Sequence, residues 1–329
     1  MKEELLKVHG LKTYFYTRQG TVKAVDGISF EIGKGETFGL VGESGCGKSV
    51  SALSVMRLVP DPPGKIVSGD ILFKGKNLRT VNEDEMRKIR GSKMSMIFQD
   101  PTSSLNPVMK IGDQILESIQ EHQELDRMRT KEKAIELMDS VGIPNPSLRF
   151  AEYPFQFSGG MRQRIMIAMA ISCNPDLLIA DEPTTNLDVT VQAQVLDLIR
   201  NISRSHNVSV LLITHNLGLI AWLCDRVAVM YSGKIVEHAN VEALFADARH
   251  PYTKALLECI PRLGEKDTKE LRVIAGRVPN LIDLPAGCRF HPRCPYSVGI
   301  CAKEEPEAIE VASGHSVSCH LVDKSMEGK

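Results

Sequence analysis

Short apolar runs and amphipathic segments alternate along most of the chain. Runs rich in Val, Ile, Phe and Tyr with glycine punctuation predict strands at residues 7–17, 24–32 and 36–42. Helical spacing of apolar residues follows at 49–59 and ends at the Pro/Gly-rich break PDPPGK. Residues 102–157 are mostly polar with helical spacing, so we expect them to form a helical insertion.

The second half of the chain contains two short apolar runs, DLLIAD at residues 176–181 and VSVLLITH at 208–215. A helical segment at 191–206 separates them. Apolar strands that alternate with helices favour a parallel sheet covered on both faces, which predicts an α/β fold. Residues 226–237 predict a hairpin around Ser-Gly, and beyond about residue 260 the periodicity is lost.

Composition limits the function classes that need to be considered. The 329 residues are 43% hydrophobic and 25% charged, which is typical of a globular protein. The net charge of −1 does not favour sequence-independent binding of nucleic acid. The N-terminus lacks the layout of a secretory signal, and no apolar run approaches the roughly 20 residues that span a bilayer. We therefore expect a cytosolic location, in which cysteines are free thiols or metal ligands.

The strongest local motif is GESGCGKS, residues 42–49, which fits G-x-x-x-x-G-K-[ST]. It follows a predicted strand and opens a predicted helix, and this context favours a phosphate-binding loop over a chance glycine-rich turn. Lys48 would reach the β- and γ-phosphates of ATP, and Ser49 would hold Mg²⁺. The predicted nucleotide-binding residues here are Gly42, Glu43, Ser44, Gly45, Cys46, Gly47, Lys48, Ser49 and Val50.

Carboxylates and other polar residues end three of the predicted strands. Asp181 ends LLIAD, where a carboxylate organises Mg²⁺, and Glu182 next to it could act as general base towards the attacking water. Gln99 follows MSMIF and could bind Mg²⁺ or water, while His215 could contact the γ-phosphate. Alone, each is more often an ordinary strand end, but together with the P-loop they favour a hydrolytic site.

A second phosphate cradle is indicated by FSGGMRQR at residues 157–164. With this segment the sequence resembles the ATP-binding cassette (ABC) family over residues 1 to about 260. The resemblance implies a P-loop ATPase core with an antiparallel β subdomain and a helical subdomain. It also implies a head-to-tail dimer, in which the partner subunit's ATP is capped by Ser158, Gly159, Gly160, Met161 and Gln163.

The resemblance also implies an aromatic residue stacked on adenine, which we assign to Phe15 with Tyr14 and Tyr16 as competitors. The chain departs from the commonest family pattern at four positions. Phe157 replaces leucine, Met161 replaces glutamine, Asn186 replaces a small residue, and Asn216 replaces aspartate. The catalytic residues are intact, so hydrolysis is expected, and the last two changes could tune coupling between subunits.

Four cysteines near the C-terminus form the pattern Cys-x5-Cys-x6-Cys-x17-Cys, with Cys288, Cys294, Cys301 and Cys319. Structural zinc sites usually place their ligands in closer pairs, and wide spacings suit an iron–sulfur cluster at least as well. Two disulfides are disfavoured in a reducing compartment. Alternative ligands are His291, His315 and His320.

The region from HPYTKALLECIPRL to the final VSCH resembles the C-terminal region of oligopeptide and dipeptide importer ATPases. This resemblance implies a [4Fe–4S] cluster on the four cysteines, with zinc as the alternative, acting as a structural staple or as a redox or iron sensor. We therefore expect an ABC nucleotide-binding domain at 1–260, its helical subdomain at about 102–165, and a small irregular cysteine-rich domain at 261–329.

The function expected from these resemblances is that of the ATPase subunit of a peptide importer. It would lie peripherally on the cytoplasmic face of the cell membrane, with a second, related ATPase as heterodimer partner and two transmembrane permease subunits. An extracellular solute-binding protein would take part indirectly, and no nucleic acid is expected. The alternatives are a soluble ABC ATPase of iron–sulfur cluster assembly, an importer of nickel or another small solute, and a regulator with an inactive cassette.

Overall fold

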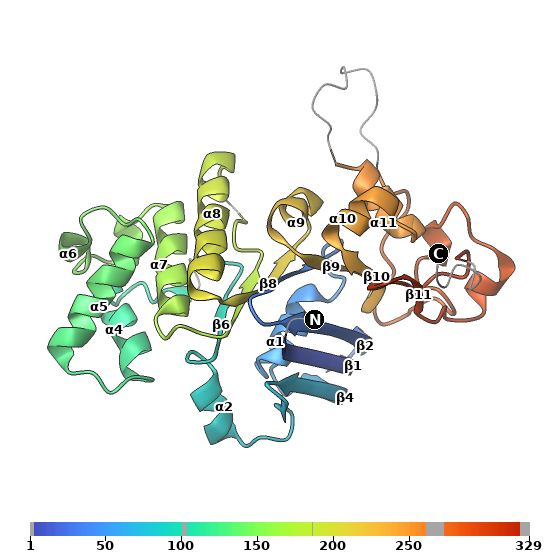
Figure 1. Cartoon of the computed structure of the whole chain (residues 1–329). Helices are drawn as coiled ribbons and strands as arrows, with labels where there is room; N and C mark the ends of the chain where they lie inside the picture. The colour runs from blue at the N-terminus through green and yellow to red at the C-terminus, as the bar shows by residue number, and fades with distance from the viewer. Residues whose placement is uncertain (1–2, 101–103, 186, 261–272, 323–329) are drawn as a thin grey trace, which may run out of the picture. The chain divides into compact units, whose positions relative to one another are not determined.

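The computed structural model of the chain describes residues 3–100, 104–185, 187–260 and 273–322 (Figure 1). The chain contacts divide it into two compact units. One unit, called the helical unit below, comprises residues 1–3, 32–37 and 80–212, and the other, called the P-loop unit, comprises 4–31, 38–79 and 213–329.

An antiparallel sheet in the P-loop unit contains β1 (Glu4–Thr17), β2 (Gly20–Gly33), β4 (Gly64–Phe73) and β5 (Lys76–Asn77). The strand order is β2-β1-β4-β5, and Phe15 pairs with Gly64. The strands predicted at 7–17 and 24–32 are confirmed. β4 was not predicted, because exposed polar residues and Gly69 interrupt its alternation.

The P-loop unit also contains the strand series β11-β12-β10-β9-β3. Its parallel pair is β3 (Thr37–Val41) with β9 (Arg226–Tyr231), and β9 forms the predicted antiparallel hairpin with β10 (Lys234–Asn240). Two C-terminal strands, β12 (His315–Val317) and β11 (Ile309–Ala312), continue the sheet from β10 by antiparallel pairing.

Four helices accompany these strands in the described part of the P-loop unit: α1 (Lys48–Val55), α9 (Leu217–Leu223), α10 (Val241–Asp247) and α11 (Pro251–Glu258). The cysteine-rich region contributes two short 3₁₀ turns, η2 (His291–Arg293) and η3 (Gly299–Ala302). Its Phe290 is 2% exposed and belongs to the same buried core as Tyr231 and Tyr252. The cysteine-rich region is therefore packed into the P-loop unit.

The helical unit holds the strands β8-β7-β6 in that order. β7 (Leu177–Asp181) and β8 (Ser209–Thr214) are buried throughout, and β6 (Met94–Ile97) pairs with β7 in parallel. Complete burial explains why these strands appear in the sequence as short, continuous apolar runs.

Helices make up the rest of the helical unit (Figure 1). Buried isoleucines at 111, 115 and 119 give α4 one apolar face, and α4 packs on α5 and α7, with α7 packing on α8. Acceptor side chains start four of the described helices of this unit, since Asn82 caps α2, Asp126 caps α5, Ser158 caps α7 and Asp188 caps α8. The helical elements are α2 (Glu83–Ile89), α4 (Ile111–Gln120), α5 (Arg127–Ser140), α6 (Pro146–Arg149), η1 (Pro154–Gln156), α7 (Gly159–Ile171) and α8 (Val189–His206).

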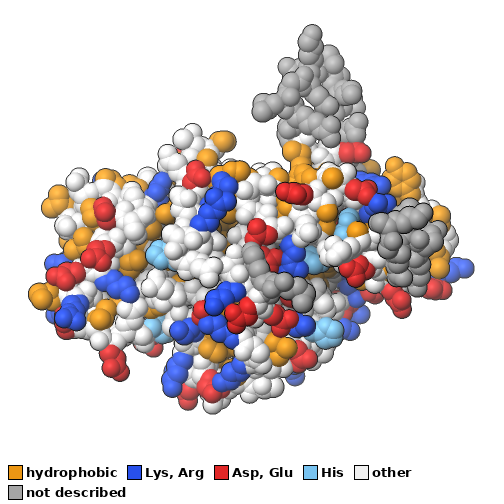
Figure 2. All heavy atoms as spheres, in the orientation of Figure 1, with side chains coloured by type: hydrophobic (Ala, Val, Ile, Leu, Met, Phe, Trp, Pro, Cys, Tyr) orange, Lys and Arg blue, Asp and Glu red, His pale blue; other side chains and the backbone are white. Residues whose placement is uncertain are grey.

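Positive and negative side chains are interspersed over the face shown in Figure 2, with hydrophobic groups scattered among them. This mixture agrees with the net charge of −1, and no single-sign field covers that face. No helix in the described part of the chain has the length and apolar character needed to cross a membrane.

Candidate functional site

The GESGCGKS loop lies between a buried strand and a helix. β3 ends at Val41, α1 begins at Lys48, and Gly47 starts the helix with a left-handed φ of 108°. A Cβ added at Gly42 would lie 2.1 Å from the Met230 carbonyl oxygen, and one at Gly47 would lie 2.2 Å from the Ala24 carbonyl oxygen. The loop therefore packs its backbone directly against neighbouring strands, which only glycine permits.

Lys48 folds back over this loop. It is 5% exposed, and its Nζ donates to the carbonyl oxygens of Gly42 at 2.8 Å and Glu43 at 3.1 Å. Cys46 is buried, and burial raises the pKa of its thiol, so it serves as a packing residue. Ser44 and Gly45 are exposed at the tip of the loop, while Ser49 and Val50 are half-buried in the first turn of α1.

Asp181 and Glu182 follow each other at the end of β7 in the helical unit. Asp181 is 4% exposed, and Glu182 has a φ of 45°, a left-handed conformation that is strained for a residue with a side chain. The Glu182 carboxylate accepts from Gln99 Nε2 at 3.2 Å and from Thr185 Oγ1 at 3.0 Å. The strained backbone of Glu182 and the two hydrogen-bond donors together fix the direction of this carboxylate.

Strand register explains why Gln99 meets Glu182. Ile97 of β6 pairs with Ala180 of β7, and the two polar residues each come two positions later. Parallel strands end at the same edge of the sheet, so these side chains must emerge together. The structure thus brings together two of the three residues predicted to be catalytic.

The third, His215, follows β8 and belongs to the P-loop unit, where it is exposed. Its neighbour Asn216 caps α9, because its side-chain oxygen accepts from the Gly218 N–H at 2.9 Å. Asn216 therefore has a helix-capping role, which sequence reasoning missed although Asn before an apolar helix is a known capping signal. Asn186 lies outside the described residues.

Ser158 is the N-cap of α7, and its Oγ accepts from the Met161 N–H. Ser158 is exposed, and Gly159, Gly160 and Met161 are half-buried at the helix start. Gln163 is 2% exposed, with its Nε2 unpartnered among the described residues. Its predicted contact with the partner subunit's ATP remains a prediction.

The three candidate adenine-stacking residues lie near the end of β1. The Tyr14 hydroxyl donates to Asp26 at 2.5 Å, and burial together with this bond raises the pKa of Tyr14. Phe15 lies against Gly64, where an added Cβ would approach its ring to 2.8 Å. Tyr16 is 53% exposed. The choice among the three remains a prediction.

The four cysteines of the C-terminal region are free thiols. The Cys288 N–H donates to the Cys301 carbonyl at 2.8 Å, and burial raises the pKa of the Cys288 thiol to about 11, with Cys319 and Cys301 adding to the shift. Burial also raises the pKa of Cys294 and of Cys319, and other cysteines contribute in both cases. These thiols therefore share one neighbourhood.

The histidines considered as alternative ligands bind other groups. His291 Nδ1 lies 2.9 Å from the Cys288 carbonyl, His315 Nε2 lies 2.8 Å from a Glu237 carboxylate oxygen, and His320 Nε2 lies 2.8 Å from the Glu304 carbonyl. Within the described ranges, no three His, Cys, Asp or Glu side chains are arranged to hold a metal ion.

Comparison with known proteins agrees with this geometry. The chain matches a family model described as "ABC transporter" over residues 25–185 and one described as "Oligopeptide/dipeptide transporter, C-terminal region" over 236–301. It is 49% identical to the dipeptide transport ATP-binding protein DppD of Bacillus subtilis over 99% of this chain and 97% of the relative. The oligopeptide transport ATP-binding protein AppD of the same organism is also 49% identical, over 97% of each chain.

Solved structures share the fold. An ADP- and Pi-bound dimer of the ATP-binding cassette MJ0796 gives a TM-score of 0.65 at 22% identity, covering 72% of this chain and 99% of that one. CbiO1 from Clostridium perfringens gives 0.63 at 25% identity, covering 75% and 92%. The predicted fold class is confirmed, and the chain belongs to the ABC transporter ATP-binding proteins, in the branch with an oligopeptide/dipeptide transporter C-terminal region.

Proposed function

We propose that this chain is the ATP-hydrolysing subunit of an importer for dipeptides or oligopeptides, lying peripherally on the cytoplasmic face of the cell membrane. Relatives named for dipeptide and oligopeptide transport support the cargo class, since they align over 99% and 97% of the chain. The single observation that carries the hydrolytic role is the Glu182 carboxylate, held by Gln99 and Thr185 directly after the buried Asp181.

The P-loop would bind the phosphates of ATP through backbone N–H groups of the GESGCGKS loop other than that of Glu43, at the positive end of α1. Lys48 would exchange its two carbonyl partners for β- and γ-phosphate oxygens. Phe15 would cover the adenine. Because the loop packs against β9 and β2 at its glycines, phosphate would meet a preformed cradle.

The residues proposed for Mg²⁺ are Ser49, Gln99 and Asp181. Their oxygen atoms are the ligand type that this hard cation prefers, and when bound it would neutralise charge on the β- and γ-phosphates. Glu182 would accept a proton from the attacking water, with Gln99 and Thr185 keeping its carboxylate in position. His215 would orient the same water against the γ-phosphate.

A dimer would complete the site. Ser158, Gly159, Gly160, Met161 and Gln163 lie at the start of the 13-residue helix α7, so the N-terminal N–H groups and the Ser158 hydroxyl could bind the partner subunit's γ-phosphate. A second, related ATPase is the proposed partner, with two transmembrane permease subunits docked near Gln99. An extracellular solute-binding protein would deliver the cargo to the permeases. As part of the same proposal, we assign 1–260 to the nucleotide-binding domain, with its helical subdomain at about 102–165, and 261–329 to the C-terminal region.

We also propose a [4Fe–4S] cluster on Cys288, Cys294, Cys301 and Cys319, acting as a structural staple. The shared neighbourhood of these thiols supports it, and four thiolates are the donor set that such clusters take. Zinc is the alternative, although structural zinc sites usually place their ligands in closer pairs than these four cysteines.

Phosphate release from ATP tests the hydrolytic role. Glu182→Gln should bind ATP but lower kcat by at least about 100-fold, because a general base contributes that much. The matched control is Glu152→Gln, which changes a carboxylate paired with Arg149 on the same unit. Wild-type turnover in Glu182→Gln would refute the assignment.

Cargo is tested with the permeases and solute-binding protein in liposomes. ATP turnover that rises with a dipeptide or oligopeptide would support peptide import, whereas a response to nickel alone would replace peptide with nickel as the cargo.

The cluster is tested by measuring iron and acid-labile sulfide on protein purified without oxygen, with about four of each expected per chain. Cys288→Ser should lose them and Cys173→Ser should not; zinc, or no metal, in the wild type would refute the cluster.

A further inference from the structure

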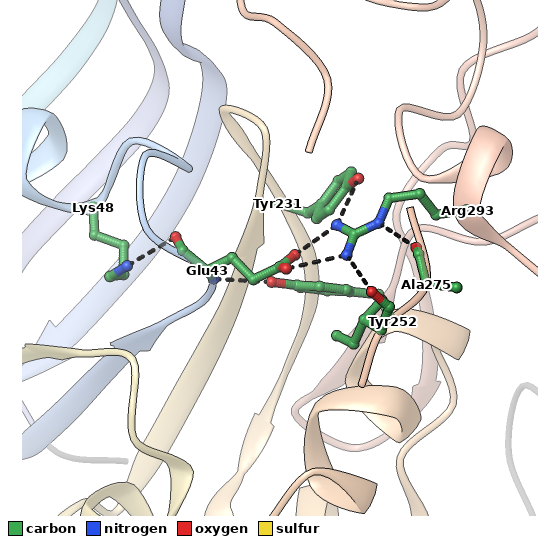
Figure 3. Close-up of polar contacts among 7 residues, drawn as sticks. Glu43, Lys48, Tyr231, Tyr252, Ala275 and Arg293 are labelled. Atoms are coloured by element: carbon green, nitrogen blue, oxygen red, sulfur yellow. Dashed lines mark hydrogen bonds and ion pairs between the residues drawn. The ribbon is translucent and has the colours of Figure 1, made fainter. Parts of the chain in front are cut away.

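Glu43, the second residue of the P-loop, makes an interaction that phosphate binding does not explain. P-loops bind phosphate through backbone N–H groups, so this side chain has no role in that chemistry. Its carboxylate instead accepts two hydrogen bonds from the guanidinium of Arg293, Nη1 to Oε2 at 2.7 Å and Nη2 to Oε1 at 3.1 Å (Figure 3). The Arg293 side chain is 3% exposed and that of Glu43 is 27% exposed.

The guanidinium of Arg293 is held on all its edges. Nε donates to the Ala275 carbonyl at 2.9 Å, Nη2 also donates to the Ile274 carbonyl at 3.2 Å, and Nη1 reaches the Tyr231 hydroxyl at 3.3 Å. A bidentate arginine–carboxylate pair fixes geometry as well as charge. Arg293 is therefore fixed in place, and it holds the Glu43 carboxylate in one position.

The backbone of Glu43 is held as well. Its N–H donates to the Tyr252 hydroxyl at 2.9 Å, and its carbonyl accepts from Lys48 Nζ at 3.1 Å (Figure 3). The rings of Tyr231 and Tyr252 lie 4.6 Å apart, and each contacts Phe290, whose ring centroid is 5.2 Å and 5.3 Å away. The first half of the P-loop therefore rests on the buried residues that surround Arg293.

A second arginine, four residues before Arg293, supports the strands next to the predicted adenine-binding residue. Arg289 is 9% exposed and donates to the Asp26 carboxylate and to the Ser232 carbonyl. The same carboxylate accepts from Tyr14, the neighbour of the proposed adenine-stacking residue Phe15. Residues 288–294, called the arginine segment below, thus fasten both the P-loop and β1.

We propose that the arginine segment positions the nucleotide site, with Arg293 as the positioning residue of the P-loop acting through Glu43. A loop that is already fixed in its binding conformation loses no conformational entropy when ATP binds. The contacts of Arg293 with Glu43 should therefore strengthen ATP affinity and leave the rate of the hydrolytic step unchanged. This inference rests on the proposed ATP site at the P-loop. It gives the C-terminal region a direct part in nucleotide binding.

Calorimetric titration of the full-length chain with ATP and Mg²⁺ tests the proposal. Arg293→Lys keeps the positive charge but cannot form the bidentate pair with the Glu43 carboxylate, and Glu43→Gln removes the negative charge. Each variant should therefore raise the Kd for ATP about 10-fold, which is the effect of losing one charge-assisted hydrogen bond. The double variant should bind no more weakly than either single variant, since both remove one interaction. At saturating ATP, kcat should stay within about twofold of wild type.

The matched control is Arg226→Lys, which changes an arginine that bridges the carbonyl and carboxylate of Glu31 in the same unit. It should leave the Kd unchanged. A merely structural role would lower the number of binding sites and kcat together while the remaining sites keep the wild-type Kd. That outcome, or a wild-type Kd in both Arg293→Lys and Glu43→Gln, would overturn the proposal.

Two further variants keep the outcomes distinct. If Arg293→Lys fails to fold, Glu43→Gln alone decides, because it changes a partly exposed side chain without changing its size. Lys48→Ala should abolish ATP binding whether or not the arginine segment positions the loop. Unchanged binding in Lys48→Ala would refute the proposed ATP site itself, and a Kd raised only in the Glu43 and Arg293 variants would then indicate a different nucleotide subsite.

Discussion

We predict that lowering the pH from 7.5 to 5.5 destabilises the P-loop unit through His250. This side chain is 1% exposed, and its Nδ1 accepts the Tyr252 N–H at 3.0 Å as the cap of α11. Burial lowers the pKa of His250 to about 4, although the Glu237 carboxylate acts in the opposite direction. Protonation would place a positive charge in this buried site. It would also turn Nδ1, the acceptor that caps α11, into a donor.

The sign follows from comparing the folded and unfolded states. The unfolded chain has a His pKa of 6.5 and takes up the proton first, so the contribution is fully present above pH 6.5 and is lost as the pH falls towards 4. Linkage gives a loss of about 1.3 kcal/mol between pH 7.5 and 5.5 and about 3 kcal/mol by pH 4. Glu237 does not interfere in this window: burial alone would raise its pKa, but hydrogen bonds from His315 and from the backbone N–H groups of Arg249 and His250 hold it below the usual 4.5.

The assay is urea unfolding followed by the fluorescence of Trp222, the single tryptophan, which lies on α9 in the same unit. His250→Asn is the reference, because asparagine can still cap α11 and does not titrate. The stability difference between wild type and this variant should shrink by about 1.3 kcal/mol over the window. A constant difference, or a His250 ring resonance that titrates near 6.5, would refute the reasoning.

Two further predictions concern the P-loop and α9. Gly47→Ala should abolish ATP binding, because φ is 108° and the new Cβ would lie 2.2 Å from the Ala24 carbonyl, whereas Gly75→Ala, where no atom lies within 4 Å of the new Cβ, should bind ATP normally; calorimetry decides. Asn216→Ala should lower the free energy of unfolding by about 1 kcal/mol through loss of a helix cap, and Asn216→Asp should not, as urea unfolding will show. Equal stability of the two Asn216 variants would contradict the capping role.

Local patterns predicted the parts of the site that lie within a few residues of each other. GESGCGKS identified a strand–loop–helix because the glycines, the lysine and the helix start form one contiguous motif. The contact between Gln99 and Glu182 could also be anticipated, since both residues end strands of one parallel sheet. The capping role of Asn216 was missed, although Asn directly before an apolar helix is a capping signal that lies within a few residues.

Contacts between distant segments could not be predicted. Arg293 and Glu43 are 250 residues apart, and neither position has an apolar period or a motif that points to the other. β11 and β12 contain four and three residues, too few for alternation to be recognised, and their pairing with β10 depends on register. Which charged side chains become buried depends on tertiary contacts. Beyond about residue 260, where the composition shifts to Pro, Gly, His and Cys, no sequence pattern indicates those contacts.

The pairing of buried carboxylates gives the C-terminal region a physical role in the P-loop unit. Asp26 and Glu237 are 8% and 1% exposed, and they bind Arg289 and His315. Removing one partner from such a pair leaves a buried charge, at a cost of about 3–5 kcal/mol against a total stability of about 5–15 kcal/mol. Carboxylates placed before residue 260 therefore depend on hydrogen-bonding partners placed after it, and the nucleotide-binding part of this chain needs its cysteine-rich end in order to hold its own buried charges.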